Sequence, residues 1–333
     1  EGGSVSYSLS SNSGLEITSD GVLTFITAPD YETKNTYTAT VFANDLEENT
    51  ETQSITVNVK DINDAPSISS DSVFSVAENQ TAIGTVVATD QDENSLSYTI
   101  TGSEISLNGS TGVLSFVAAP DYETKSSYTE TVTASDSSLS VTQTITVNIT
   151  DVNEVPSFTS SATFSADENQ TAIGTVAATD PEDGTITFSI SGSDITINPA
   201  TGAIAFASAP DYETTTSYSA TVTASDGTND TTQSITVNIN NLNDNNPSFT
   251  SSATFSADEN QTAIGTVAAV DADGDTLTYS ISGSDITINS ATGVIAFASA
   301  PDYETTTSYS ATISVSDGSN AETQDITVSI GNL

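Results

Sequence analysis

The strongest constraint on the fold is an internal repeat of about 90 residues. The string PDYET occurs four times at intervals of 90 or 91 residues, beginning at Pro29, Pro120, Pro210 and Pro301. A second string, ENQTAIGTV, recurs at the same spacing, beginning at Glu78, Glu168 and Glu259. A fixed period of this length indicates an array in which one structural unit occurs several times.

The period divides the 333 residues into one partial and three complete repeats. We expect the partial repeat at 1–64 and complete repeats at 65–154, 155–245 and 246–333. The stretch Ser4–Tyr7 matches Ser95–Tyr98 inside the second repeat, so the first block lacks the opening strands. The last block stops where another connection would begin. We therefore expect both ends to be cuts through a longer array.

Each repeat has the sequence pattern of an all-β domain. Ser234–Ile239 and Tyr218–Thr223 alternate polar and apolar residues, which is the period of a half-buried strand. Ile195–Phe206 contains two short apolar runs around a Pro/Gly-containing turn, which indicates a hairpin. No amphipathic helical stretch of ordinary length is present. About seven short strands in ~90 residues predict an immunoglobulin-like sandwich.

The composition excludes several classes of function. Acidic residues number 45, whereas the basic residues are Lys34, Lys60 and Lys125, and the net charge is −42. Such a chain cannot neutralise the phosphates of a nucleic acid or bind an anionic membrane surface. No apolar run approaches the ~20 residues of a membrane span. The self-repulsion of so much negative charge indicates that a cation belongs to the folded protein.

The missing residue types restrict which cation this could be. Histidine, cysteine, methionine and tryptophan are absent, which removes the usual ligands of zinc, copper, haem and iron–sulfur clusters. A Ser-His-Asp or Cys-His arrangement cannot be built from this chain. Carboxylate and carbonyl oxygens remain, and these are the ligands that calcium and magnesium take.

Acidic residues recur at four places in every complete repeat, and three polar joints connect the blocks. The joints are Asp61–Pro66, Asp151–Pro156 and Asn241–Pro247. The recurring positions are the glutamate of the ENQ string, a DxD-like pair, the DYE pair and the aspartate of an (A/V)SD string: Glu78, Asp90, Asp92, Asp121, Glu123 and Asp136; Glu168, Asp180, Glu182, Asp211, Glu213 and Asp226; Glu259, Asp271, Asp273, Asp302, Glu304 and Asp317. The partial repeat has Asp30 and Glu32.

These positions have two interpretations. Asp, Asn and Pro are ordinary loop formers, and an aspartate in the DYE string could simply cap a turn. The third and fourth repeats are near copies, so repetition alone does not decide between capping and metal binding. The second repeat has diverged and still carries every cluster. Together with the charge, this favours calcium ligands.

In this order, the xEN, DYE, DxND(N)xPxF, DxD and xSDG strings resemble the extracellular cadherin repeat. The stretch Asn241–Phe249, which reads NLNDNNPSF, carries the most specific match. The ~90-residue unit and its Ser/Thr richness are similar to bacterial cadherin-like repeats of large surface adhesins. The resemblance implies tandem seven-stranded Greek-key sandwiches arranged as an elongated rod. It also implies Ca²⁺ held at each joint by two successive repeats.

The resemblance assigns one ligand set to each joint. For the first joint the set is Asp30, Glu32, Asp61, Asn63, Asp64, Asp90, Asp92 and Asp136, without an upstream glutamate. For the second it is Glu78, Asp121, Glu123, Asp151, Asn153, Glu154, Asp180, Glu182 and Asp226, with the carbonyls of Val152 and Val155. For the third it is Glu168, Asp211, Glu213, Asn241, Asn243, Asp244, Asp271, Asp273 and Asp317. Glu154, Glu182 and Asn241 depart from the aspartates that the family prefers.

The leading hypothesis is therefore a calcium-stiffened spacer of a bacterial cell-surface adhesin, extracellular and supporting adhesion. The alternative is direct binding of a polysaccharide or of another copy of the chain. A sugar platform needs exposed aromatic rings, and the spacing of Phe116, Phe206 and Phe297 is more typical of a core. Catalysis by paired carboxylates is disfavoured, because the pairs recur in every repeat and do not form a single active site.

Overall fold

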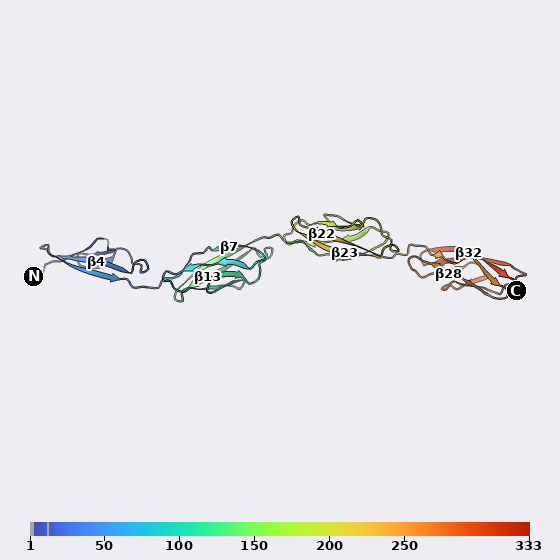
Figure 1. The fold of residues 1–333 in the computed structure, drawn as a ribbon, viewed down its shortest axis with the longest axis horizontal. Coiled ribbons are helices and arrows are strands. Elements are labelled where there is room, and N and C mark those ends of the chain that lie inside the picture. Colours follow the sequence, from blue (N-terminus) through green and yellow to red (C-terminus); the bar gives the residue numbers. More distant parts are fainter. Residues whose placement is uncertain (1–2, 12) are drawn as a thin grey trace. The chain divides into compact units, whose positions relative to one another are not determined.

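The computed structural model describes residues 3–11 and 13–333, and the regular elements in these ranges are all β-strands (Figure 1). The chain divides into two compact units, residues 1–152 and 153–333. Within the described residues, no helix has the length and apolar character needed to cross a membrane.

The third repeat illustrates the common fold. Its strands are β15 (Ser157–Phe158), β16 (Thr163–Asp167), β17 (Ala172–Thr175), β18 (Ala178–Thr179), β19 (Thr187–Ile190), β20 (Ile195–Ile197), β21 (Ala203–Phe206), β22 (Ser217–Ser225) and β23 (Asp230–Asn240). One sheet has the order β16-β23-β22-β19, and the other has the order β17-β21-β20. The short strands β15 and β18 pair separately. In this repeat, β16 and β23 form the one parallel pairing of the described strands.

The nine segments correspond to seven strands, because two of the strands are interrupted. The opening strand is split into β15 and β16, which pair with β18 and β23 respectively. The second strand is split into β17 and β18. The two sheets form the predicted sandwich, so the all-β tandem fold class is confirmed.

The second and fourth repeats have the same order of strands. In the second repeat the strands are β6 (Ser67–Ile68), β7 (Val73–Ala77), β8 (Ala82–Thr85), β9 (Ala88–Thr89), β10 (Ser97–Ile100), β11 (Ile105–Leu107), β12 (Val113–Phe116), β13 (Ser127–Ser135) and β14 (Ser140–Thr150). In the fourth they are β24 (Ser248–Phe249), β25 (Thr254–Asp258), β26 (Ala263–Thr266), β27 (Ala269–Val270), β28 (Thr278–Ile281), β29 (Ile286–Ile288), β30 (Val294–Phe297), β31 (Ser308–Ser316) and β32 (Ala321–Gly331).

The first repeat contains the later strands of this order. They are β1 (Ser6–Leu9), β2 (Leu15–Ile17), β3 (Leu23–Phe25), β4 (Thr36–Asn44) and β5 (Thr50–Asn58). The sheets are β1-β4-β5 and β2-β3. They correspond by position and pairing to β10-β13-β14 and β11-β12 of the second repeat.

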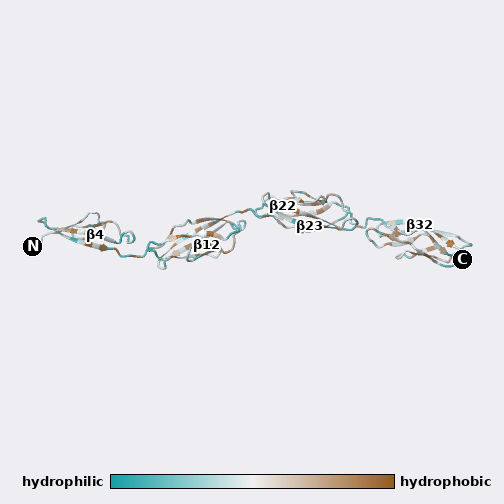
Figure 2. Ribbon diagram, in the orientation of Figure 1, coloured by the Kyte–Doolittle hydropathy of each residue, from teal (hydrophilic) through white to brown (hydrophobic). Residues whose placement is uncertain are grey.

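The core follows from alternation along the strands, because successive side chains point to opposite faces of a sheet. On β23, Ile235, Val237 and Ile239 are buried while the residues between them are exposed. Figure 2 shows apolar residues (brown) along the strands and mostly polar residues (teal) in the connections. Phe206 is 3% exposed, and the centroid of its ring lies 5.1 Å from the centroid of the Tyr218 ring.

The equivalent rings Phe116 and Phe297 are also buried, as the spacing predicted. They are core residues and do not form a sugar platform.

The predicted hairpin is present and depends on a glycine. Ile195 pairs with Phe206 across β20 and β21. Gly202 in the turn has φ +69°, and a Cβ there would lie 2.1 Å from the Val176 carbonyl oxygen. Gly112 and Gly293 occupy the same place with the same 2.1 Å approach. Any side chain would therefore be strained and would also clash with the backbone.

Truncation of one core residue tests this packing. Ile235 is 1% exposed, so Ile235→Ala should destabilise the third repeat by about 2–5 kcal/mol through lost burial and a residual cavity. Thr236→Ala, at the adjacent exposed position, is the matched control and should change stability by less than ~1 kcal/mol. Hydrogen exchange read separately for each repeat is the measurement. Equal effects of the two substitutions would contradict this description of the core.

Candidate metal centres at the joints

A buried glutamate ties each complete repeat to the joint that follows it. Glu168 is 2% exposed, and its Oε1 accepts the backbone N–H of Leu242 in the third joint at 2.7 Å. Its Oε2 accepts the N–H of Tyr212 in the DYE string at 2.8 Å. Glu78 and Glu259 make the same pairs of bonds. Because burial of a carboxylate is costly, these N–H donors are required, and a nearby cation would stabilise the arrangement further.

The DYE string forms a turn, and its aspartate caps that turn. Asp211 Oδ2 accepts the Thr214 hydroxyl at 3.0 Å, and Oδ1 accepts the Thr214 N–H at 3.3 Å. Asp30, Asp121 and Asp302 make similar bonds to the threonine three residues later. These aspartates therefore cap turns, and the remaining lone pairs of the same carboxylates stay available to a cation.

The glutamate of the same DYE string faces other carboxylates. Burial and the charges of Glu168 and Asp273 raise the pKa of Glu213, although its own backbone N–H lowers it. Like charges nearby make this carboxylate harder to ionise, and a bound cation would offset their repulsion.

The DxD pair and the (A/V)SD aspartate begin tight loops. Asp317 Oδ1 accepts the N–H groups of Ser319 and Asn320, both at 2.6 Å. Its Oδ2 is buried and accepts no hydrogen bond that meets ordinary geometry from the described residues, and the residue is 8% exposed. Asp271 also has one oxygen bonded to a loop N–H and a buried Oδ2 without a partner. One oxygen of each carboxylate thus accepts hydrogen bonds from N–H groups of the loop, and the other accepts none from the described residues.

The third joint brings carboxylates of two successive repeats together. Oxygens of Glu168, Glu213, Asp244 and Asp273 all lie within 4.8 Å of one another. The amide group of Asn245 lies among them. Its Nδ2 donates to Asp273 Oδ1 and Asp244 Oδ1, each at 2.9 Å, and to Glu213 Oε2 at 3.3 Å.

Sequence reasoning missed Asn245. The available signal was the extra asparagine that makes the third joint one residue longer than the other two. Asn241, predicted as a ligand, donates its Nδ2 to the Asp273 carbonyl oxygen at 2.8 Å. Asn243 Oδ1 accepts the side chain of Asn320 at 3.4 Å.

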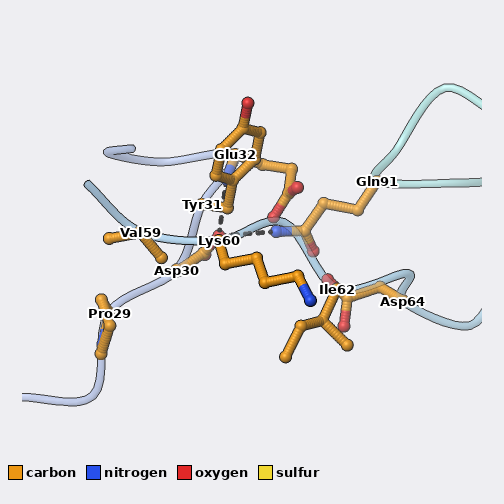
Figure 3. A pocket seen from close by; sticks show the side chains of 9 residues that line it. All are labelled: Pro29, Asp30, Tyr31, Glu32, Val59, Lys60, Ile62, Asp64 and Gln91. Atoms are coloured by element: carbon orange, nitrogen blue, oxygen red, sulfur yellow. Dashed lines mark hydrogen bonds between the residues drawn. The ribbon is translucent and has the colours of Figure 1, made fainter. Parts of the chain in front are cut away.

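The first joint is also assembled from two repeats. Oxygens of Glu32, Asp61 and Asp92 lie within 4.8 Å of one another. Asp92 Oδ2 accepts the Asp64 N–H at 2.7 Å, and Asn63 Nδ2 donates to Asp136 Oδ2 at 2.8 Å. Figure 3 shows Gln91 reaching Asp30, with Nε2 3.1 Å from Oδ1.

The residues predicted for the second joint fall in both units, and each half is described by itself. In the unit of residues 1–152, oxygens of Glu78, Glu123 and Asp151 lie within 4.8 Å of one another. In the unit of residues 153–333, Asn153 Nδ2 donates to Asp226 Oδ2 at 2.8 Å, and Glu182 Oε1 accepts the Glu154 N–H at 2.8 Å. The second half thus repeats the contacts of Asn63 and Asp64 in the first joint.

The donor set fits a hard cation. Six carboxylate oxygens on the downstream side of the joints are buried and have no hydrogen-bond partner among the described residues: Asp90 Oδ2, Asp92 Oδ1, Asp180 Oδ2, Glu182 Oε2, Asp271 Oδ2 and Asp317 Oδ2. Buried charged oxygens are normally paired. Six to eight oxygens at flexible angles, including carboxylates and amide carbonyls, match the coordination of Ca²⁺.

The loop aspartates make stability depend on pH. Hydrogen bonds from Asn63 and from the N–H groups of Leu139 and Ser138 lower the pKa of Asp136 below its ordinary value of 3.8. Its contribution to stability is therefore complete above pH 3.8 and is lost as the pH falls through the lower pKa of the folded state.

Asp136→Asn should remove this pH-dependent part. The variant's melting temperature should fall less than that of the unchanged chain between about pH 5 and pH 2, measured by calorimetry without calcium. Asp20→Asn, at an exposed turn position, serves as the control. Parallel pH curves for Asp136→Asn and the unchanged chain would rule out this role for the carboxylate.

Comparison with known proteins shows which family the chain resembles in sequence. The family model described as cadherin domain matches residues 72–150, 161–240 and 252–331. The chain is 35% identical to the protocadherin-like wing polarity protein stan of Drosophila melanogaster, over 60% of this chain and 6% of that protein. It is 31% identical to protocadherin Fat 4 of Mus musculus, over 93% of this chain and 7% of that protein. The chain thus spans less than a tenth of the length of these relatives.

Solved structures give the same result. The extracellular domain of protocadherin gamma B4 superposes with a TM-score of 0.66 at 25% identity, over 98% of this chain and 60% of that chain. Domains EC3–6 of protocadherin gamma B7, solved as a cis-dimer, show the same fold with a TM-score of 0.60 at 22% identity, over 99% of this chain and 94% of that chain. The chain belongs to the cadherin family and consists of tandem cadherin repeats.

Proposed function

We propose that the joints bind Ca²⁺ and that the bound ions stiffen the array. The observation that carries this proposal is the set of buried carboxylate oxygens without hydrogen-bond partners beside the joints. Asp180 is the clearest case, because a residue only 7% exposed leaves Oδ2 without a partner among the described residues. A cation bonded to these oxygens would compensate for their desolvation.

The charge of the chain explains why binding would stiffen a joint. The net charge is −42, and carboxylates from two repeats meet at a joint, so they repel when no cation is bound. A bridging Ca²⁺ replaces repulsion by bonds to both neighbours. Extracellular calcium modules bind with Kd on the order of 10⁻⁴–10⁻³ M, so extracellular calcium would load them and cytosolic calcium would not. Binding only to the ordered state stabilises it by about 2.7 kcal/mol at a hundredfold excess over Kd.

The proposed ligands are the sets named for the three joints in the sequence, with Asn245 added to the third. The repeats would be bounded at 65–154, 155–245 and 246–333, after the partial repeat 1–64. Each ion would be shared by the glutamate and DYE string of one repeat, the joint, and the DxD and (A/V)SD aspartates of the next repeat.

We further propose that the stiffened array is an extracellular spacer that supports adhesion. The relatives are long cadherins, and the protocadherin gamma B4 structure is an extracellular domain. The ~90-residue repeat and its Ser/Thr richness favour a bacterial surface adhesin as the host protein. The role of such a spacer is to hold a binding module away from the cell surface, without catalysis of its own.

Small-angle X-ray scattering of the full chain tests the stiffening. We expect the maximum dimension to be larger and the distance distribution narrower with millimolar CaCl₂ than with EDTA. MgCl₂ at equal ionic strength controls for simple charge screening. If calcium leaves the scattering curve unchanged, the proposed stiffening is wrong.

The third joint offers a substitution that should strengthen binding. Asn241 stands where the family prefers aspartate and donates to the Asp273 carbonyl oxygen. Asn241→Asp would replace a neutral side chain by a charged oxygen ligand and should lower the Kd of this joint by about three- to tenfold. Asn198→Asp, in the turn between β20 and β21, adds the same charge elsewhere and should have little effect. Calorimetric titration of the chains is the measurement, and unchanged affinity would remove Asn241 from the ligand set.

A further inference from the structure

We propose that Lys60 is a built-in cation of the first joint and weakens calcium binding at that joint. This inference rests on the proposed calcium binding and adds a device that belongs to one joint. With Lys60 in place, the first joint would remain a hinge up to a higher calcium concentration than it would without the lysine.

Lys60 lies among acidic residues of the first joint. Lys60 lines a hollow of about 410 Å³ together with Asp30, Glu32 and Asp64 of the first repeat and its joint, and Gln91 of the second repeat. Figure 3 shows its side chain extending across this hollow, with the ammonium end toward Ile62 and Asp64. The lysine is thus directed into the joint.

The carboxylate cluster of the first joint shares one residue with the lining of this hollow. Glu32, Asp61 and Asp92 bring their oxygens within 4.8 Å of one another, and Glu32 is among the residues lining the hollow. Asp90 Oδ2 and Asp92 Oδ1 are buried oxygens without hydrogen-bond partners. Glu32 belongs both to this carboxylate cluster and to the lining of the hollow, so a calcium ion bound through Glu32 would lie near a fixed positive charge.

The other joints carry a neutral residue at this position. The period places Thr150, Asn240 and Gly331 where the first joint has Lys60. Thr150 pairs with Ala77, and Asn240 donates its Nδ2 to Asp167 Oδ1 at 2.8 Å. The joint stretches and the residues just before them therefore contain a single basic residue, which belongs to the first joint.

The size of the effect follows from Coulomb's law. A unit charge within ~4–6 Å of a divalent ion, in a water-like dielectric and at physiological ionic strength, lowers affinity by roughly three- to tenfold. This repulsion between the ammonium group and the bound ion would weaken calcium binding at the first joint.

Hydrogen exchange of the full chain during a calcium titration tests the proposal, because it reads each joint separately. The calcium midpoint for protection of residues 59–66 reports on the first joint, and that for residues 239–247 reports on the third. Lys60→Thr, which introduces the residue found at position 150, should lower the first midpoint by about three- to tenfold and leave the second unchanged. Lys60→Arg keeps the charge and should keep the high midpoint.

Lys125→Thr is the matched control for loss of one positive charge. Lys125 forms an ion pair with Glu104 and lies over the Tyr128 ring, away from the hollow that Lys60 lines. It should leave the midpoint of residues 59–66 unchanged. If Lys60→Thr also leaves that midpoint within twofold of the original, the role of Lys60 is wrong while calcium binding stands. If neither joint gains protection with calcium, the proposed function itself is wrong, and the inference falls with it.

Discussion

The feature on which the joints depend is a carboxylate buried against backbone N–H groups. Glu78, Glu168 and Glu259 are at most 6% exposed, and each accepts one N–H from the DYE string and one from the segment after the last strand. These bonds fix where the chain leaves a repeat. They also place a negative charge at the point where the joint adds more carboxylates. This concentration of negative charge is what the proposed cation would offset.

The strand register of the sandwich positions this glutamate beside the joint. In the third repeat β16 runs parallel to β23, and the last pair in the ladder is Asp167 with Asn240. Glu168 follows directly, and its N–H donates to the Asn240 carbonyl oxygen. The two strands end side by side, so the glutamate side chain lies against the start of the third joint. A parallel partner is required here, because an antiparallel strand would have its opposite end at the joint.

Much of this was predictable from the sequence, and the rest was not for identifiable reasons. The period and the alternation of residues such as Ile235 and Val237 predict the repeats and the sandwich, because burial on one face repeats every second residue. The acidic clusters are also visible in the sequence. The sequence does not show which oxygen of a carboxylate accepts hydrogen bonds from the loop and which one has no partner. Asp211 is used for a turn cap, whereas Asp317 leaves Oδ2 without a partner.

The side-chain amides of the joints were harder still to interpret. Asn63 and Asn153 were expected to present oxygen, and both present Nδ2 to the aspartate of the following loop at 2.8 Å. Asn245 does the same toward Asp273. An amide carries two N–H donors on one side and a carbonyl oxygen on the other, so rotation of the group exchanges one for the other.

One asparagine can therefore hold neighbouring carboxylates together as a donor, or turn and coordinate a metal through its oxygen. This gives a physical reason for asparagine in a joint crowded with acidic groups. Aspartate in the same place could act only as a ligand and would add to the repulsion whenever the ion left. In the proposed calcium-binding joints, charged residues would supply affinity, and neutral amides would limit the electrostatic cost of losing the ion.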